Sequence, residues 1–494
     1  MAKTRDTIPP FTLPDPSLTF LSTEADEFSY RSLFTFARYL EKIVQPYRPA
    51  GEHPLLIVTD SSAEVVFSIA ACFLLKIPVF PLHKNSTQKE VEKILSTVRP
   101  AAVISNDRHS AITFGDLPVL NIPYDALKTP GSDEPEVFLF DDPENFAGYF
   151  LTSGSTGAPK IVPLKRRQVF YGASSSAKNF RPSLNKYWLL CLPVHHVGGI
   201  NVIYRSLLFN SAIFLVPAFD EENIRSLLNE NKNFEVASMV PTMLQRLLEH
   251  TFFRVQFGFK AFLLGGGPIT MHLINEALTR GLPLVTSYGM TETCAQIAAN
   301  PMLKPGGDYI PKQSVGPVFE PNEIDIRDDL GQSLPLNESG QIWLKGPQVF
   351  DGYLNQAQNK SAFDQNGWFN TGDFGHLNRK KQLFIENRRS DLIVTGGENV
   401  NPQEVENAMN DIPGVQESAV IGVPDEKWGQ MAVAFVVLEN DNMSRNHIKK
   451  QLKLQLQGFK IPKQFISVNY LPKTSSEKVK KSELLKWYMK KFGL

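Results

Sequence analysis

The chain has 494 residues, and its 51 Lys and Arg residues balance 51 Asp and Glu residues, so its formal net charge at pH 7 is zero. This length is too great for one hydrophobic core and predicts two or three domains. The 42% hydrophobic and 21% charged residues are typical of a globular protein and argue against a disordered or fibrous chain. The balanced charge provides no overall field to attract nucleic acid or an anionic membrane.

The three cysteines, Cys72, Cys191 and Cys294, are far apart and form no Cys-x-x-Cys pair, and the nine histidines show no metal-binding spacing. The N-terminal residues lack the continuous apolar segment of a signal peptide. The longest apolar stretch, residues 65–75, is shorter than the roughly 20 residues that a membrane-spanning helix needs. We therefore expect a protein of the reducing cytoplasm without an integral membrane segment.

Apolar runs and helical patterns alternate from Leu55 onward in a way that is typical of a parallel, doubly wound sheet. Strands are predicted at 55–59, 77–82 and 101–105, and helices at 61–76 and 86–98. Ser86 is the expected N-cap of the second helix. A second α/β half is predicted after residue 152. Its strands are expected at 187–192, 212–216, 236–240, 261–264 and 284–288, and its helices at 200–209, 221–229, from Pro241 onward and at 271–279.

Helical periodicity fades after about residue 311. Short β-like pieces at 323–327 and 341–345 predict a β-rich subdomain. The remaining residues predict a small α+β domain with helices at 402–409 and 445–456, strands at 417–423 and 431–438, and a Lys-rich tail. The predicted fold class is therefore α/β, with a large N-terminal domain (1–387), a hinge (388–391) and a small, mobile C-terminal domain (392–494).

The segment 151–160 reads Leu-Thr-Ser-Gly-Ser-Thr-Gly-Ala-Pro-Lys and predicts a phosphate-binding loop. Its hydroxyls, its glycines and the cation at its end could surround a polyphosphate. The common P-loop pattern is absent, because only two residues separate the glycines, and an ordinary turn is the alternative interpretation. The candidate phosphate-binding residues are Thr152, Ser153, Gly154, Ser155, Thr156, Gly157 and Lys160.

Six segments together resemble the adenylate-forming superfamily of acyl-CoA synthetases, luciferases and peptide-synthetase adenylation domains. These segments are 152–160, 287–293, 370–373, 387–393, 396–402 and 471–478, and they follow the order found in that superfamily. The resemblance extends from about residue 30 to residue 485. It implies an enzyme that uses ATP and Mg²⁺ to convert a carboxylic acid into an acyl-adenylate, and then transfers the acyl group to coenzyme A.

The resemblance also implies roles for individual residues around the nucleotide. Thr291 would contact the α-phosphate, Glu292 would bind the metal, Tyr288 would face adenine, and Asp373 and Arg388 would contact the ribose. Further candidates for nucleotide binding are Gly266, Gly267, Gly289 and Met290. The alternatives are a helix N-cap followed by a first-turn acid for Thr291 and Glu292, core packing for Tyr288, and a turn aspartate for Asp373.

In the C-terminal part, Lys478 matches the superfamily's lysine that stabilises the transition state of adenylation. A solvated lysine in a Lys-rich tail is the alternative. Ser390 occupies the pivot position, where the superfamily commonly has Asp or Lys. The candidate CoA-binding residues are Gly396, Gly397 and Glu398. Two further departures are Ile161 and Glu477, each at a position where the superfamily usually has glycine; they and Ser390 leave the hinge energetics and the backbone freedom of these turns open.

The acyl pocket is expected to lie among residues 192–199, 264–268 and 287–290, and its candidate substrate-binding residues are His196, Arg205, Gly265 and Ser287. Residues 192–210 contain no acid that could bind an amino-acid ammonium group. The local sequence is instead similar to the family of o-succinylbenzoate:CoA ligases of menaquinone biosynthesis. That substrate has two carboxylates, and Arg205 could bind the one that is not activated. A snorkelling or ion-paired helix residue is the alternative for Arg205, and a core histidine is the alternative for His196.

Two other functions remain open from the sequence. One is a generic acyl- or aryl-CoA ligase of lipid or aromatic acid metabolism, because superfamily membership does not determine the substrate. The other is a non-catalytic nucleotide-binding regulatory protein, which the presence of Glu292, Asp373, Arg388 and Lys478 argues against. The expected partners are a small carboxylic acid, ATP and CoA, with no nucleic acid. A homodimer is compatible with the sequence, which does not itself indicate an oligomeric state.

Overall fold

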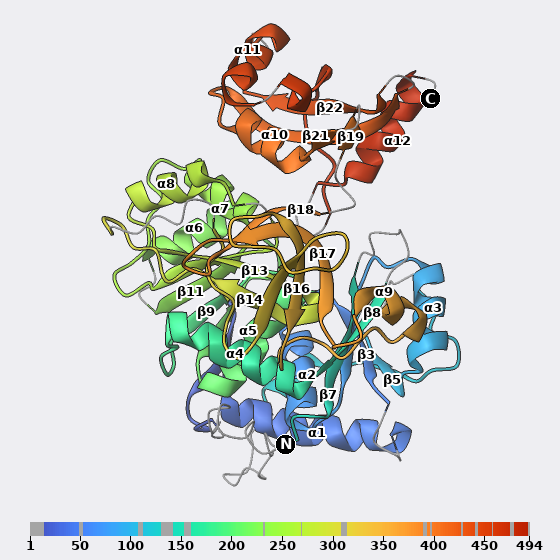
Figure 1. Ribbon diagram of the computed structural model, residues 1–494. Coiled ribbons are helices and arrows are strands. Elements are labelled where there is room, and N and C mark those ends of the chain that lie inside the picture. Colours follow the sequence, from blue (N-terminus) through green and yellow to red (C-terminus); the bar gives the residue numbers. More distant parts are fainter. Residues whose placement is uncertain are drawn as a thin grey trace.

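The structure is a computed structural model. It describes residues 14–48, 53–106, 112–129, 142–152, 160–230, 233–267, 269–307, 314–388, 393–395, 398–425, 428–439, 443–456, 458–474 and 479–492. These residues form four β-sheets, three in a large N-terminal part and one in a smaller C-terminal part that stands above it in Figure 1. Among the described residues no helix has the length and apolar character needed to cross a bilayer.

The first sheet has the strand order β6-β5-β3-β4-β7-β8. Its strands are β3 (Leu55–Thr59), β4 (Val79–His83), β5 (Ala102–Ile104), β6 (Val119–Leu120), β7 (Phe146–Thr152) and β8 (Lys160–Lys165). All neighbours are parallel except β7 and β8. In β3, Leu55 and Ile57 enter one hydrophobic core, whereas Leu56 and Val58 enter another. Both faces of this sheet are therefore covered, which confirms the predicted doubly wound arrangement.

Helix α3 (Gln88–Val98) covers the outer face of this sheet, and its N-cap lies one residue later than predicted. Its N-cap is Thr87, whose hydroxyl accepts from the Glu90 N–H while the Glu90 carboxylate accepts from the Thr87 N–H. The prediction of Ser86 as the cap was wrong. Only Thr87 has a glutamate three residues later, and that spacing forms the reciprocal capping box.

The second sheet has the strand order β14-β13-β12-β11-β9-β10-β1-β2. Its strands are β1 (Thr19–Ser22), β2 (Glu27–Ser29), β9 (Tyr187–Leu190), β10 (Ala212–Leu215), β11 (Phe234–Met239), β12 (Ala261–Leu264), β13 (Leu284–Met290) and β14 (Ala295–Ala299). The five predicted strands are confirmed as parallel neighbours, and β14 and β2 are antiparallel additions at the edges.

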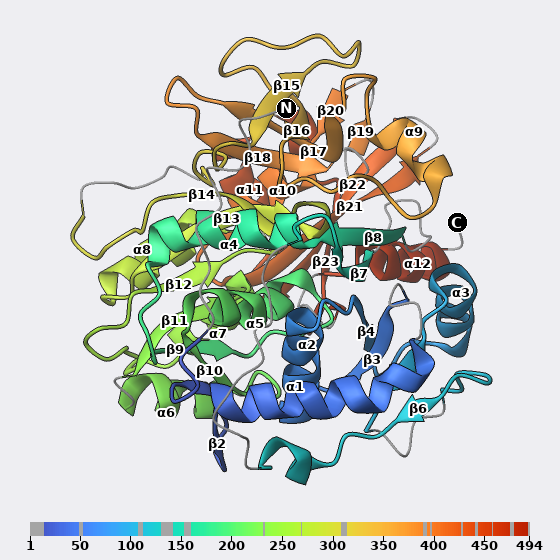
Figure 2. The ribbon, with the colours of Figure 1, turned by 90° about the horizontal axis from the view of Figure 1, so that it is seen from below.

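Helices cover both faces of the second sheet. On the outer face lie α6 (Glu221–Glu230), α7 (Pro241–Leu248) and α8 (Met271–Thr279). Helices α2 (Ala63–Leu74) and α5 (Val197–Phe209) pack against each other between the two sheets, as Figure 2 shows. One continuous core joins the two halves and therefore fixes the position of α5 relative to both sheets.

Two long helices of the N-terminal part were not predicted. These are α1 (Tyr30–Val44) and α4 (Arg166–Phe180). Helix α4 contains Gly172 and three consecutive serines, and these residues have low intrinsic helix propensity. It nevertheless buries Val169, Phe170 and Phe180 in the main core, so tertiary packing overrides its local propensity.

The third sheet confirms the predicted β-rich subdomain. Its antiparallel strands are β15 (Glu323–Arg327), β16 (Gly340–Lys345), β17 (Phe369–Leu377) and β18 (Leu383–Arg388). Short helices in the N-terminal part are α9 (Asn359–Ala362), η1 (Gln45–Tyr47), η2 (Tyr124–Leu127), η3 (Thr291–Thr293) and η4 (Gln356–Gln358).

The C-terminal part is α+β, as predicted, and has two cores of its own. Its elements are β19 (Ile393–Thr395), β20 (Glu398–Val400), α10 (Pro402–Asn410), β21 (Val415–Asp425), β22 (Gly429–Leu438), α11 (Arg445–Gln455), η6 (Gly458–Lys460), β23 (Gln464–Ser467) and α12 (Lys481–Phe492). Helix α12 forms from the Lys-rich tail, for which no helix was predicted. The predicted pivot Ser390 lies outside the described residues.

Candidate active site

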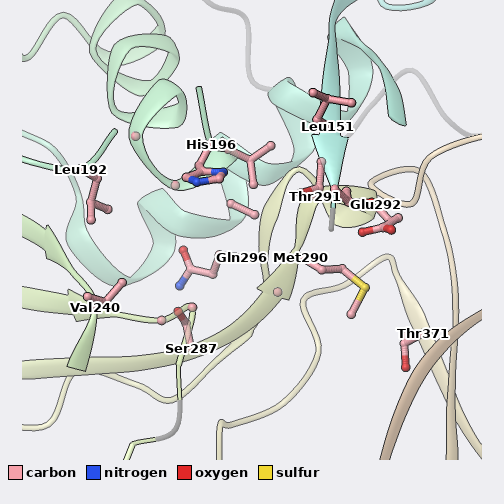
Figure 3. Close-up of a pocket in the computed structure, with 18 of the residues that line it drawn as sticks. Leu151, Leu192, His196, Val240, Ser287, Met290, Thr291, Glu292, Gln296 and Thr371 are labelled. Atoms are coloured by element: carbon pink, nitrogen blue, oxygen red, sulfur yellow. The ribbon is translucent and has the colours of Figure 1, made fainter. Parts of the chain in front are cut away.

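A cavity of about 760 Å³ lies at the carboxyl ends of β11, β12 and β13, where the β7–β8 hairpin, α5 and the third sheet also meet. Figure 3 shows the side chains that line it. The volume is typical of a small-molecule site. Ligands of open α/β sheets bind at the carboxyl ends of the strands, so this is the position in which a substrate is expected.

The two described ends of the predicted phosphate-binding segment lie at this cavity. Thr152 at the end of β7 and Lys160 at the start of β8 both line the cavity. The Nζ atom of Lys160 lies 4.5 Å from the centroid of the Tyr353 ring. The remaining predicted loop residues, Ser153, Gly154, Ser155, Thr156 and Gly157, lie outside the described residues.

Thr291 and Glu292 follow β13 directly and both line the cavity (Figure 3). They belong to the short helix η3, whose N-cap is Met290, so the interpretation of Thr291 as a helix N-cap is wrong. Glu292 is 9% exposed, and its Oε1 atom accepts a hydrogen bond of 2.8 Å from the Tyr353 hydroxyl. This bond fixes a buried carboxylate at the cavity wall.

Gly289 and Gly265 line the cavity at two points of close packing. A Cβ atom on Gly289 would lie 1.7 Å from the carbonyl oxygen of Ala295, so only glycine permits β13 and β14 to pair here. A Cβ atom on Gly265 would lie 2.8 Å from the Ser287 Oγ atom. The predicted residues Gly265, Gly266, Ser287, Gly289 and Met290 all line the cavity, whereas Gly267 is described but does not.

Tyr288 and Asp373 are brought together from β13 and β17. The Tyr288 hydroxyl donates a 2.7 Å hydrogen bond to the Asp373 Oδ2 atom. Neither residue is part of the cavity lining, although Asn370, Thr371 and Gly372 beside Asp373 are. Arg388 is the backbone partner of Asp373 in the β17–β18 ladder, and its side chain lies outside the described part of the structure.

His196 and Arg205 reach the cavity from α5: His196 is the N-cap residue of this helix, and Arg205 lies in its third turn. Arg205 is 3% exposed, and its guanidinium carbon lies 5.2 Å from the centroid of the Trp188 ring. Within the described residues its Nε atom has no hydrogen-bond partner and no carboxylate forms an ion pair with it. Burial lowers the pKa of Arg205 to about 10, so it remains charged at pH 7. Arg205 therefore does not extend to the surface, and it forms no ion pair with the described residues. The alternative interpretation of Arg205 as a snorkelling or ion-paired residue is wrong for this part of the chain.

The predicted C-terminal site residues are only partly described. Lys478, Gly396 and Gly397 lie outside the described residues, and Glu398 begins β20 without a described side chain. Thr474, which precedes Lys478 in the same motif, lines the cavity. A residue of the C-terminal part therefore contributes to the wall of a cavity that belongs mainly to the N-terminal part.

The cavity residues that were not predicted from the sequence include Gln296 and Tyr353. Gln296 is a polar residue within the otherwise apolar strand β14, and this exception was a detectable signal. Tyr353 follows a Gly in a loop and contacts both Lys160 and Glu292. Nothing local distinguishes such a tyrosine, because both contacts come from distant parts of the chain.

Three histidine rings contact one another in edge-on and tilted arrangements beside the cavity. The centroids of the His83 and His195 rings are 4.6 Å apart, and those of His195 and His196 are 4.2 Å apart. The Nδ1 atom of His195 lies 3.4 Å from the Thr59 hydroxyl. Burial, reinforced by the neighbouring His196 and His83, lowers the pKa of His195 from 6.5 to about 3. His195 is therefore neutral at physiological pH.

This depressed pKa predicts that folding stability falls as the pH drops below about 6.5 toward 3. In that window the unfolded chain binds a proton at His195 that the folded chain does not bind. A His195→Phe variant, which keeps a ring, should show a shallower decrease in melting temperature between pH 7 and pH 5. An equal slope in the wild type and in His195→Phe would contradict this prediction.

The residues around Glu292 fit a magnesium site that includes the nucleotide. The described residues contain no cluster of three or more His, Cys, Asp or Glu side chains that could hold a metal, and Glu292 is the only carboxylate among the described lining residues. Mg²⁺ usually binds one or two carboxylates, with phosphate oxygens and water as the other ligands. One buried carboxylate in a cavity that Thr152 and Lys160 also line matches that donor set.

Comparison with known proteins identifies the family. Residues 16–354 match the AMP-binding enzyme family, and residues 404–478 match the AMP-binding enzyme C-terminal domain. A 2-succinylbenzoate–CoA ligase of Listeria monocytogenes is 36% identical over 404 residues, which are 82% of each chain. A protein of the same description from Enterococcus faecalis is 32% identical and covers 97% of this chain and 95% of its own.

A solved structure with the same fold is the o-succinylbenzoate CoA synthetase of Bacillus subtilis in complex with the acyl-adenylate intermediate OSB-AMP. It has a TM-score of 0.82, 30% sequence identity and 95% coverage of each chain. The same Bacillus protein was also solved with ATP and a magnesium ion, with a TM-score of 0.83. The chain therefore belongs to the AMP-binding enzyme family and is an AMP-forming ligase of the adenylate-forming superfamily.

Proposed function

We propose that this chain is a 2-succinylbenzoate–CoA ligase. Its substrate would be a benzoate that carries a four-carbon 4-oxo acid chain at the ortho position, and therefore has two carboxylates. The observation that carries this proposal is Arg205, a buried cation on the cavity wall without a carboxylate partner among the described residues. A buried charge is strongly destabilising unless it is paired, so a ligand carboxylate is the natural partner. The names of the relatives support the same substrate.

The two ends of the cavity differ in a way that suits this acid. Thr291 and Glu292 lie at one end, and the apolar side chains of Leu192 and Val240 lie at the other, as Figure 3 shows. The aliphatic carboxylate would lie beside Thr291, and the aromatic ring would lie toward Leu192 and Val240. The ring's own carboxylate would bind Arg205 through charge-assisted hydrogen bonds.

In the first step an oxygen of the aliphatic carboxylate attacks the α-phosphorus of ATP, the bond to the β-phosphate breaks, and pyrophosphate leaves. No general base is needed because the acid is already ionised at neutral pH. Lys160 would attract the phosphates that leave, and Glu292 would hold Mg²⁺. The metal would neutralise phosphate charge when bound. The protein's contribution is thus mainly positioning and electrostatic stabilisation.

In the second step the sulfur of coenzyme A attacks the acyl carbon and AMP leaves, which yields the thioester. For this step we propose that the C-terminal part rotates about Ser390 and brings Gly396, Gly397 and Glu398 to the CoA. The domain limits 1–387 and 392–494 belong to the same proposal. Placement in the cytoplasm and assembly as a homodimer remain predictions from the sequence.

The purified protein should release AMP and form the thioester with 2-succinylbenzoate, ATP, Mg²⁺ and CoA, as measured by pyrophosphate release and mass spectrometry. A panel with benzoate, medium-chain fatty acids and amino acids tests specificity. Turnover of fatty acids without turnover of 2-succinylbenzoate would replace the proposal with a generic acyl-CoA ligase. If the protein binds ATP but converts none of these acids, the result would favour the non-catalytic regulatory alternative.

Lys478→Ala should lower the rate of adenylation by about 10²- to 10³-fold, the range measured when one transition-state donor is removed. The reaction of CoA with a chemically supplied acyl-adenylate should change little, because Lys478 is assigned to the first step only. Lys480 is a matched control: it forms an ion pair with Glu483 in α12, and Lys480→Ala should leave both steps unchanged. Unchanged adenylation in Lys478→Ala would refute the role of that lysine.

A further inference from the structure

Gln296 is a buried polar side chain in the cavity wall. It is the second residue of β14, it is 4% exposed, and it lines the cavity. Neither Nε2 nor Oε1 of its carboxamide has a hydrogen-bond partner in the described structure. Its backbone carbonyl is satisfied, because it accepts a 2.6 Å hydrogen bond from the Gln348 amide. The side chain is therefore the part of Gln296 that awaits a partner.

An amide in this position is costly for folding. A buried polar group without a partner destabilises a protein by about 1–3 kcal/mol, and most such groups are paired in native structures. The rest of β14, Ala-x-Ile-Ala-Ala, is apolar, so an apolar side chain would also suit this strand. No described protein group pairs with the amide, so a molecule that enters the cavity can supply its partner.

The position of Gln296 identifies which part of a ligand it would meet. In Figure 3 its amide lies between His196 and Ser287, on the path from Thr291 toward Leu192 and Val240. In this view an acid with its carboxylate at Thr291 and its ring near Val240 would extend past Gln296. In a 4-aryl-4-oxobutanoate the atoms between those ends are two methylenes and the ketone, and the ketone is the only hydrogen-bonding group among them.

We propose that the Gln296 Nε2 group donates a hydrogen bond to the ketone oxygen of the acid substrate, so that the site selects 4-oxo acids over their 4-methylene analogues. This inference rests on the proposed function and adds to it a second recognition element. The charge distribution favours this division of roles. Arg205 is a cation and therefore suits the aryl carboxylate. The neutral amide of Gln296 suits the neutral ketone, because the amide oxygen of Gln296 would repel a carboxylate.

The test compares 2-succinylbenzoate with 4-(2-carboxyphenyl)butanoate, which has a methylene in place of the ketone but retains both carboxylates. We expect wild-type kcat/KM to favour the ketone by about 10- to 100-fold, the range expected when a buried donor is left unpaired. In Gln296→Met, which has similar volume but no donor, this preference should fall to within about twofold. Most of the decrease in kcat/KM in this variant should occur with the ketone substrate. The melting temperature should be unchanged or higher, because no protein hydrogen bond is lost.

Gln168 is the matched control. It is also fully buried, but both polar atoms of its side chain are hydrogen-bonded within the protein and it does not line the cavity. Gln168→Met should therefore lower the melting temperature and leave the ketone preference intact. If the wild type converts both acids equally well, or if Gln296→Met retains the preference, the inference is wrong while the proposed function stands. If the wild type converts neither acid, the proposed function itself fails.

Discussion

Arg205→Met is expected to lower kcat/KM for 2-succinylbenzoate by about 10²- to 10³-fold, because loss of one partner of a buried charge pair costs about 2–5 kcal/mol. The loss should be absent for 4-oxo-4-phenylbutanoate, which lacks the aryl carboxylate. The variant should thus convert the two acids with similar efficiency, whereas the wild type should strongly prefer the dicarboxylate. Steady-state kinetics with both acids measure this directly.

The same substitution should leave the free protein equally stable or more stable. Without ligand, Arg205 is a buried cation that contacts the Trp188 ring and has no ion-pair partner among the described residues. Replacement of such a charge by an apolar side chain is often neutral or stabilising by about 1–4 kcal/mol. A higher melting temperature together with lower activity is the signature of a residue retained for binding rather than for folding.

Arg246 provides the matched control for Arg205. It also lies against an aromatic ring, that of Phe219, but it is half-exposed, is ion-paired with Glu221 on the surface and does not line the cavity. Arg246→Met should leave kinetics with both acids unchanged and slightly lower the melting temperature. If Arg205→Met lowers the turnover of both acids equally, Arg205 does not recognise the second carboxylate.

Glu292→Gln is expected to lower the rate of adenylation by about 10²- to 10³-fold, since the charge at the metal position is lost. The variant retains an acceptor for the Tyr353 hydroxyl, so the local structure should persist. A readout that does not depend on turnover is calorimetric binding of a non-hydrolysable ATP analogue. Mg²⁺ should strengthen this binding in the wild type and have little effect in Glu292→Gln.

The control for Glu292 is Glu235, which has the same 9% exposure but forms an ion pair with Lys260 and does not line the cavity. Glu235→Gln should leave the magnesium dependence intact while modestly lowering stability. If Glu292→Gln still shows full magnesium dependence of nucleotide binding, another group holds the metal. The assignment of Glu292 would then be withdrawn, although Thr291 could retain its role.

Most of the parallel strands were predictable because they are buried on both faces and read as short, continuous apolar runs. Their order in the sheets was not, since β1 joins a sheet whose neighbouring strand β10 is almost 200 residues later. Helix α4 was missed because its local sequence favours a helix only weakly. It is stabilised by contacts with the core that periodicity does not reveal.

For the site, motif resemblance indicated Thr291, Glu292, His196 and Arg205, and all four line one cavity. Motif resemblance did not indicate Gln296, which is significant because its side-chain amide has no hydrogen-bond partner among the described residues. Its place in an otherwise apolar strand was a signal in the sequence, but only the folded structure shows that the amide lacks a partner among the described residues. The pairing of Tyr288 with Asp373 likewise joins residues from different sheets.

The sequence alone indicated the chemistry of this protein, because adenylation requires particular side chains in local segments that can be read in order. The tertiary structure decided which polar groups are left unpaired at the cavity. That property depends on the burial of Arg205 and Gln296 and on the absence of partners among the described residues, and both arise from chain segments distant in sequence. Substrate selection is therefore a property of the folded cavity, whereas the reaction type is a property of the motifs.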